Sequence, residues 1–130
     1  MPYYNAAKYI KETVEAIIAQ TYKDWELIIV DDCSPAPETA DVLQEVQDMD
    51  SRIKVIKAEV NGGAGAARNL GIAAAQGRYL AFCDSDDYYA DSHVLETLVN
   101  TLSKWDYPDA LLFCRNDYYE NLQAMHPESP

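Results

Sequence analysis

The sequence predicts an α/β fold, in which a mostly parallel sheet is flanked by helices. Short runs of apolar residues alternate with longer segments that carry apolar residues at helical spacing. The runs at residues 27–30 and 79–83 are almost continuously apolar, which indicates strands buried on both faces of a parallel sheet. Alternation of helices with such strands is typical of a doubly wound, Rossmann-like sheet with right-handed crossovers.

Four helices are predicted from apolar residues that recur every three or four positions. The first covers residues 6–20, with Asn5 as its N-cap, and the second covers residues 38–48. The third is an alanine-rich segment that ends at Gly77, and the fourth starts near residues 91–92. Apolar residues on one side are the pattern of a helix that covers a sheet.

Four strands alternate with these helices, at residues 27–30, 53–57, 79–83 and 109–114. Residues 1–5 are too short for an element, so we expect the chain to enter its first helix without a preceding strand. The chain becomes polar after Tyr119, which predicts a frayed tail over residues 121–130. The sequence therefore predicts one domain over residues 1–120, followed by that tail.

The composition limits the classes of partner. With 130 residues, of which 48% are hydrophobic, the chain has enough apolar material for one core. Its formal net charge of -12, without a basic stripe, argues against a nucleic-acid partner. No run approaches the roughly 18 apolar residues of a membrane-spanning helix, and three cysteines without close spacing indicate reduced thiols. We therefore expect a cytoplasmic location.

Carboxylates gather after two of the predicted strands. Asp84, Asp86 and Asp87 follow one strand, and Asp31 and Asp32 follow another. Ligands of open α/β sheets bind outside the carboxyl ends of the strands, so the first three side chains should project into a binding crevice. Neighbouring carboxylates repel unless a cation lies between them, and Mg²⁺ uses one or two carboxylates together with water and substrate phosphates. The pattern predicts a divalent-metal site, with a solvated acidic loop as the alternative.

Other ligand-binding motifs fit the sequence less well. Gly63 and Gly65 imitate the dinucleotide fingerprint G-x-G-x-x-G, but Arg68 stands where its third glycine is required. A P-loop would need Gly-Lys-Ser/Thr, and an EF-hand that begins at Asp84 would have Tyr89 in place of glycine. A dinucleotide-binding domain, a nucleotidyltransferase-like domain and a non-catalytic nucleotide-binding module remain alternative interpretations.

Four longer motifs follow one another along the chain. They are Pro-Tyr-Tyr-Asn at 2–5, Gln-Thr-Tyr-Lys-Asp-Trp-Glu-Leu-Ile-Ile-Val-Asp-Asp-Cys-Ser at 20–34, Asn-Gly-Gly-Ala-Gly-Ala-Ala-Arg-Asn-Leu-Gly at 61–71 and Gly-Arg-Tyr-Leu-Ala-Phe-Cys-Asp-Ser-Asp-Asp at 77–87. Together they resemble the family 2 glycosyltransferases, which are inverting enzymes of GT-A fold, and the resemblance extends to about Tyr119. It implies transfer of a sugar from a nucleotide-diphosphate sugar, with a UDP-sugar favoured, to a saccharide or lipid-linked acceptor in polysaccharide biosynthesis.

The resemblance also implies roles for single residues. Tyr4 and Asp32 are expected to hold the nucleobase, and Arg68 to contact the nucleotide. Asp84 is expected near the ribose, and Asp86 on a Mg²⁺ or Mn²⁺ ion that bridges the diphosphate. No residue after the Asp-x-Asp motif can be matched to the catalytic base. The full expected set is Pro2, Tyr4, Asp31, Asp32, Arg68, Asp84 and Ser85 for the nucleotide-sugar, with Asp86 and Asp84 for the metal.

The chain departs from the family pattern at both ends. Family members begin with an apolar strand that ends at the proline matched by Pro2, and they continue well past the Asp-x-Asp motif. We therefore expect a donor-binding portion that lacks its first strand, binds nucleotide poorly and transfers no sugar alone. Unpaired backbone groups at the strand edges cost roughly 1 to 3 kcal/mol each, which predicts self-association through those edges. For the full-length enzyme, a peripheral position at the inner membrane is the alternative to a purely cytoplasmic one.

Overall fold

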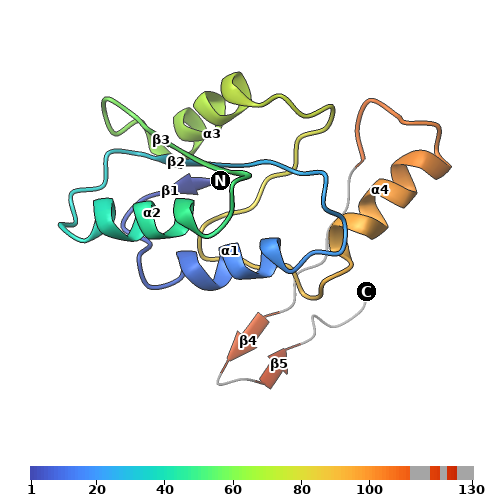
Figure 1. Cartoon of the computed structure of the whole chain (residues 1–130), viewed down its shortest axis with the longest axis horizontal. Helices are drawn as coiled ribbons and strands as arrows, with labels where there is room; N and C mark the ends of the chain where they lie inside the picture. Colours follow the sequence, from blue (N-terminus) through green and yellow to red (C-terminus); the bar gives the residue numbers. More distant parts are fainter. Residues whose placement is uncertain (112–117, 121–122, 126–130) are drawn as a thin grey trace. The chain divides into compact units, whose positions relative to one another are not determined.

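The computed structural model describes residues 1–111, 118–120 and 123–125, and it divides into two compact units, Met1–Leu98 and Val99–Pro130 (Figure 1). The first unit is built on a three-stranded parallel sheet in the order β1-β2-β3. Its strands are β1 (Pro2–Tyr3), β2 (Leu27–Asp31) and β3 (Ile53–Lys57). The helices are α1 (Ile10–Ile18), α2 (Thr39–Asp48), α3 (Gly63–Ala74) and α4 (Val94–Lys104), the last of which continues into the second unit.

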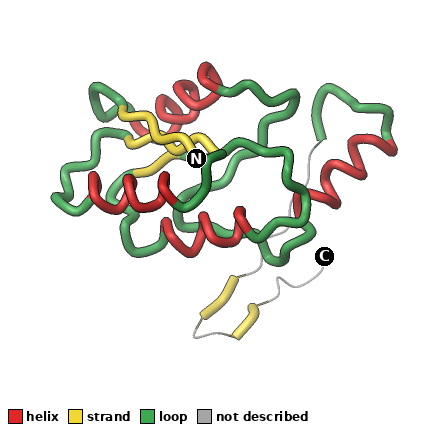
Figure 2. The backbone as a smooth tube through the Cα atoms, viewed as in Figure 1, coloured by secondary structure: helices red, strands yellow, loops and turns green. Residues whose placement is uncertain are grey.

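Helices cover both faces of the sheet, as a doubly wound α/β fold requires. Helices α1 and α2 lie on one side and α3 on the other (Figures 1 and 2). Side chains alternate between the faces of a strand, so Leu27 and Ile29 of β2 pack into the core cluster that contains α1 and α2. Ile28 and Val30 pack with Ala67 of α3 instead. Because both faces are covered, every residue of β2 is buried.

The predictions made from local patterns are confirmed for β2, β3 and α2, whose bounds differ from the expected ranges by at most one residue. The first helix starts later than predicted, at Ile10 rather than residue 6. Asn5 is not its N-cap, because Asn5 has a φ of 49° and its Oδ1 accepts a hydrogen bond from the backbone N–H of Ala36. The third helix likewise ends at Ala74, before Gly77.

The predicted strand at residues 79–83 is wrong. This segment is irregular, and Leu80 and Phe82 are 49% and 58% exposed. A strand forms only where a neighbouring strand supplies hydrogen-bonding partners, and the described residues provide no ladder beside this segment. The apolar composition of residues 79–83 therefore predicted a buried strand, whereas the segment is irregular and partly exposed.

Residues 1–5 do contain a strand, contrary to the sequence prediction. Pro2 and Tyr3 of β1 pair in parallel with Val30 and Asp31. The backbone N–H of Val30 donates to Met1 O at 2.9 Å, and that of Asp32 donates to Tyr3 O at 2.9 Å. Strand β1 thus occupies the predicted gap beside Val30 and Asp31, and the N-terminal amino group of Met1 donates to Ile28 O at 2.9 Å. Strand β3 pairs along the opposite edge through all five of its residues.

The second unit contains the end of α4 and an antiparallel pair, β4 (Tyr118–Glu120) and β5 (Gln123–Met125). Strand β5 lies within the segment that was predicted to be a frayed tail, whose residues 126–130 lie outside the described part of the chain. Residues 109–111 of the predicted strand at 109–114 are irregular, and residues 112–114 lie outside the described part of the chain. Among the described helices, none has the length and apolar character needed to cross a membrane.

Candidate functional site

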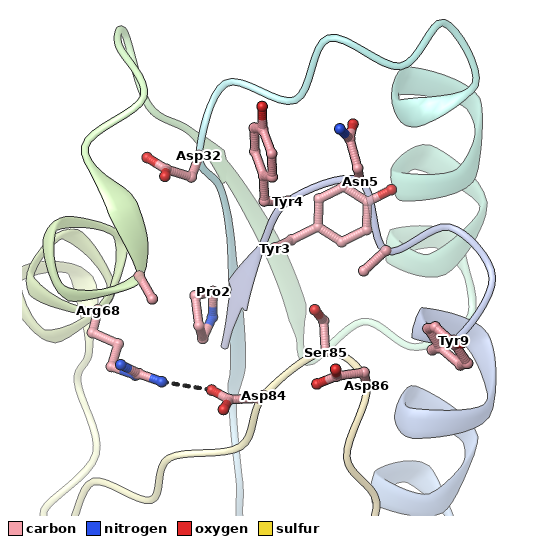
Figure 3. Close-up of a pocket in the computed structure, with 12 residues that line it drawn as sticks. Pro2, Tyr3, Tyr4, Asn5, Tyr9, Asp32, Arg68, Asp84, Ser85 and Asp86 are labelled. Carbon is pink, nitrogen blue, oxygen red and sulfur yellow. Dashed lines mark hydrogen bonds and ion pairs between the residues drawn. The ribbon is translucent and has the colours of Figure 1, made fainter.

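A cavity of about 320 Å³ lies where β1 and β2 end, in the crevice where ligands of α/β sheets bind (Figure 3). Its walls come from four parts of the first unit: the end of β1 and the turn into α1, the end of β2, one side of α3, and the segment around the Asp-x-Asp motif. The lining residues are Pro2, Tyr3, Tyr4, Asn5, Ala6, Tyr9, Asp32, Ala64, Arg68, Asp84, Ser85 and Asp86.

One wall of the cavity carries an ion pair between Arg68 of α3 and Asp84. Arg68 Nη2 donates to Asp84 Oδ1 at 2.7 Å, and the two side chains are 36% and 46% exposed (Figure 3). Ion pairs with this degree of solvent contact contribute only about 0 to 1 kcal/mol to stability. Arg68 can therefore exchange its carboxylate partner for an anionic ligand at little cost.

Asp32 is hydrogen-bonded to the glycine-rich turn at the start of α3. Its Oδ1 accepts the backbone N–H of Gly62 at 2.8 Å, and its Oδ2 accepts that of Gly63 at 2.7 Å. The turn needs glycine at both positions, because Gly63 has a φ of 84° and a Cβ on Gly62 would lie 2.7 Å from Ala66 Cβ. A buried carboxylate at a helix N-terminus also interacts favourably with the helix dipole. Asp32 thus positions α3 and, through it, Arg68.

The neighbouring Asp31 has a different environment. It is only 3% exposed, and its Oδ1 accepts the backbone N–H of Ser34 at 3.0 Å in the turn that follows β2. Asn5 also holds this turn, because its backbone N–H donates to Ser34 Oγ at 3.1 Å. Asp31 is not among the residues that line the cavity.

The residues 84–87, here called the acidic turn, contribute Asp84, Ser85 and Asp86 to the lining of the cavity. The backbone N–H of Asp87 donates to Asp84 O at 3.1 Å, which closes the turn. Ser85 is 7% exposed, and its carbonyl accepts a hydrogen bond from Thr13 Oγ1 at 3.1 Å. Burial, together with the negative charges of Asp86 and Asp84, raises the pKa of Asp87 above its usual value. The like charges therefore repel, as the sequence pattern indicated.

The donor set fits a single divalent cation held jointly with a ligand. Asp86 lines the cavity, and no hydrogen bond or ion pair to its carboxylate is found among the described residues. The same part of the chain contains no cluster of three or more His, Cys, Asp or Glu side chains arranged for a metal ion. Mg²⁺ commonly binds through only one or two carboxylates and takes its other ligands from phosphates and water, so the two observations are compatible.

The structure brings most of the sequence-predicted residues together. Every predicted residue except Asp31 lines the cavity. Sequence reasoning missed Asn5 as a site residue, since it was assigned to a helix cap, and it missed Tyr9 and Ala64. Tyr9 precedes α1 at 44% exposure, and nothing in the local pattern distinguishes it from the other tyrosines.

Comparisons with known proteins show which sequences this chain resembles. The sequence profile of Glycosyl transferase family 2 matches residues 1–129. TuaG of Bacillus subtilis (strain 168), whose name refers to teichuronic acid biosynthesis, is 51% identical over 86 residues, covering 66% of this chain and 34% of TuaG. WfaP of Escherichia coli is named as a UDP-Glc:alpha-D-GlcNAc-diphosphoundecaprenol beta-1,3-glucosyltransferase; it is 44% identical over 91 residues, covering 70% of this chain and 35% of WfaP. This chain therefore spans about a third of the length of these relatives.

Solved structures give the same fold. TarS of S. aureus, residues 1–349, in complex with UDP-GlcNAc, superposes with a TM-score of 0.72 at 31% identity, over 79% of this chain and 30% of that one. A mannosyltransferase from Pyrobaculum calidifontis, in complex with GDP-Man and Mn²⁺, has a TM-score of 0.72 at 23% identity, over 78% and 30% of the two chains. The fold of the first unit is thus the GT-A fold.

Proposed function

We propose that this chain, which belongs to glycosyl transferase family 2, binds the nucleoside diphosphate of a sugar donor in the cavity between β1, α3 and the acidic turn. The observation that carries the proposal is that the Arg68–Asp84 ion pair, Asp86, Tyr4 and Asp32 all line one cavity. A cation, carboxylates and an aromatic ring in one crevice suit a diphosphate, a metal ion and a base. UDP is favoured because TarS was solved with UDP-GlcNAc and WfaP is named for UDP-Glc.

The nucleobase end would lie against Tyr4 and Asp32. Tyr4 is 50% exposed, so its ring offers a surface for a planar base. A carboxylate has about four lone-pair sites, of which the N–H groups of Gly62 and Gly63 use two. The remaining sites of Asp32 can accept the imide N–H of uracil without releasing the glycine-rich turn. Pro2 and Ser85, which also line the cavity, would complete the nucleotide contacts.

The diphosphate end would lie between Arg68 and the acidic turn. Asp86, with Asp84 beside it, would hold a Mg²⁺ or Mn²⁺ ion against the phosphate oxygens. When bound, such an ion neutralises the charge that develops on the departing nucleoside diphosphate. Arg68 would turn from Asp84 to the phosphates, which releases Asp84 for the ribose or the ion. This exchange offsets the repulsion that a net charge of -12 exerts on an anionic donor.

Transfer with inversion requires a hydroxyl of the acceptor to attack the anomeric carbon from the face opposite the leaving group, while a general base removes its proton. We propose a saccharide or a lipid-linked saccharide as the acceptor, as the name of WfaP suggests for that enzyme. None of the described residues of this chain is assigned as the base. The present chain would therefore contribute donor binding, and the complete reaction would need acceptor-side residues as well.

Titration calorimetry with UDP, in Mn²⁺ and then in EDTA, tests the proposal. We expect tighter binding with the metal, and weak or no binding of NAD under either condition. Equal affinity for UDP with and without Mn²⁺ would refute the metal-dependent site. Tight NAD binding would favour the dinucleotide-binding alternative, and metal-dependent UDP binding without any turnover in a longer chain would favour a non-catalytic module.

Asp86→Asn is expected to remove most of the Mn²⁺-dependent gain in UDP affinity, a loss of at least about 10-fold, because it takes away a metal ligand. The fold should stay intact, since Asp86 is an exposed side chain. Without metal, the thermal midpoint should stay the same or rise slightly, because one charge leaves the acidic turn. Asp24→Asn is the matched control, as it removes another exposed negative charge that does not line the cavity. A sharp fall in thermal midpoint for Asp86→Asn alone would mean that the turn is structural.

Self-association is also proposed, through the irregular segment at 79–83 rather than through β2. Leu80 and Phe82 expose about half of their side chains, whereas every residue of β2 is buried and the strand is paired with β3 along its whole length and with β1 at Val30 and Asp31. The edge strand β3 is protected by the exposed Lys54 and Lys57, which disfavour pairing with another chain. In sedimentation equilibrium, the double variant Leu80→Ser, Phe82→Ser should shift the protein towards monomer, and Val60→Ser, a change at another exposed apolar residue, should not. A monomeric parent protein would contradict this proposal.

A further inference from the structure

Thr13 is a buried polar residue on the apolar face of α1. It is 2% exposed and lies among Ile10, Val14 and Ile17, all of which belong to the main core cluster. A threonine in a helix can satisfy its hydroxyl on a carbonyl of the preceding turn. The Thr13 hydroxyl instead donates to Ser85 O, at a sequence separation of 72 residues. Its hydrogen bond therefore fixes a distant segment, not the helix itself.

The carbonyl that Thr13 engages lies between the two carboxylates of the Asp-x-Asp motif. Ser85 is 7% exposed and lines the cavity between Asp84 and Asp86 (Figure 3). Backbone that has no regular secondary structure takes its position from such contacts. Among the described residues, this carbonyl is the one group of the acidic turn that is hydrogen-bonded to α1.

Gln20, which follows the C-cap of α1, binds the far end of this segment. It is fully buried, donates from Nε2 to Asp91 O at 2.7 Å and accepts the backbone N–H of Leu95 at Oε1 at 3.0 Å. The irregular stretch between Ser85 and Asp91 is therefore hydrogen-bonded at one end to α1 and at the other to the residue that follows its cap. Gln20 acts on the start of α4, whereas Thr13 acts directly on the residue between the proposed metal-binding carboxylates.

We propose that Thr13 is a positioning residue, which sets the orientation of Asp84 and Asp86 toward the metal and diphosphate through its hydrogen bond to Ser85 O. The inference rests on the proposed function of the cavity. It distinguishes two parts of the site: the metal-diphosphate end depends on Thr13, whereas the nucleobase end is held by the contacts of Asp32 with the glycine-rich turn. Loss of the Thr13 hydroxyl should therefore weaken binding at the metal-diphosphate end and leave binding at the nucleobase end unchanged.

The test compares Thr13→Val with the unmodified chain by measuring UDP affinity in Mn²⁺ and in EDTA. Valine keeps the size and branching of threonine but cannot donate a hydrogen bond. We expect the Mn²⁺-dependent gain in affinity to fall about 10-fold, in the range found when partners that orient a metal ligand are removed. The affinity in EDTA should change less than about twofold. Line broadening by Mn²⁺ of the amide signals from residues 84–87, in the presence of UDP, gives a second readout that needs no turnover.

Two controls separate positioning from general destabilisation. Thr13→Ser keeps the hydroxyl and should restore the metal-dependent gain, while Val46→Ala weakens the same core from α2 and should leave that gain unchanged. Thr13→Ala serves as a second variant without the hydroxyl if Thr13→Val does not fold. A full metal-dependent gain in either hydroxyl-free variant overturns the inference, as does an equal loss of affinity in EDTA. Absence of the gain in the unmodified chain overturns the proposed function, and this inference with it.

Discussion

Replacing Asp32 with alanine is expected to lower the free energy of unfolding by about 2 to 4 kcal/mol and to abolish detectable nucleotide binding. The substitution removes two hydrogen bonds that the backbone N–H groups of Gly62 and Gly63 donate to a carboxylate, and a hydrogen bond to a charged group contributes roughly 1.5 to 3 kcal/mol. It also removes a negative charge from the N-terminus of α3. Binding is lost because α3 carries Arg68, and because the proposed partner of the nucleobase is gone.

Urea unfolding followed by circular dichroism measures the first effect, and calorimetry with UDP the second. Asp31→Ala is the matched control, since Asp31 is an equally buried neighbour that accepts the backbone N–H of Ser34 and does not line the cavity. Asp31→Ala should lower the free energy of unfolding by less than Asp32→Ala does, and it should leave some UDP binding. Asp32→Ala with unchanged stability would show that water replaces the carboxylate, and that the glycine-rich turn is not held by Asp32.

The elements that the sequence predicted well are those whose signals are local. Strand β2 is a continuous apolar run, α2 has its apolar residues at helical spacing, and both form where predicted. The segment at 79–83 has an equally strong apolar signal but forms no strand, because a strand also depends on a hydrogen-bonding neighbour that is distant in the chain. Strand β1 shows the reverse: two residues with no local signal form a strand because β2 is there to pair with them.

In the candidate site, too, local sequence patterns predicted some features, and contacts between distant residues determine the others. Its residue types and their order along the chain indicated the cavity, since motifs that follow parallel strands gather at one edge of a sheet. Sequence alone did not separate Asp31 from Asp32, which differ because successive side chains of a strand point to opposite faces. Thr13 gave no signal as a site residue. It occupies a core-facing position of an amphipathic helix, and its link to Ser85 arises only from tertiary packing.

Raising the pH above about 9 is expected to destabilise the protein strongly, because two acidic groups of the first unit are kept neutral by burial. Burial, followed by the charge of Asp87, raises the pKa of the Cys83 thiol from 9.0 to about 11. Burial, followed by Cys83, raises the pKa of Tyr89 from 10.0 to about 12. In the unfolded chain these groups lose their protons at the lower values, so the unfolded state binds fewer protons and stability falls as pH rises.

The size of the effect follows from the shifts. Each group contributes stability that is fully present below its unfolded pKa and is lost as pH rises towards its folded pKa, from 9 to 11 for Cys83 and from 10 to 12 for Tyr89. A shift of about two units corresponds to about 2 to 3 kcal/mol for each group.

Urea unfolding in EDTA at pH 8, 9.5 and 11 measures the loss of stability, and two variants assign that loss to the two groups. Tyr89→Phe should reduce the loss above pH 10, and Cys83→Ser should reduce the loss that begins near pH 9. Parallel pH profiles for the unmodified chain and both variants would mean that neither group is held neutral in the folded state.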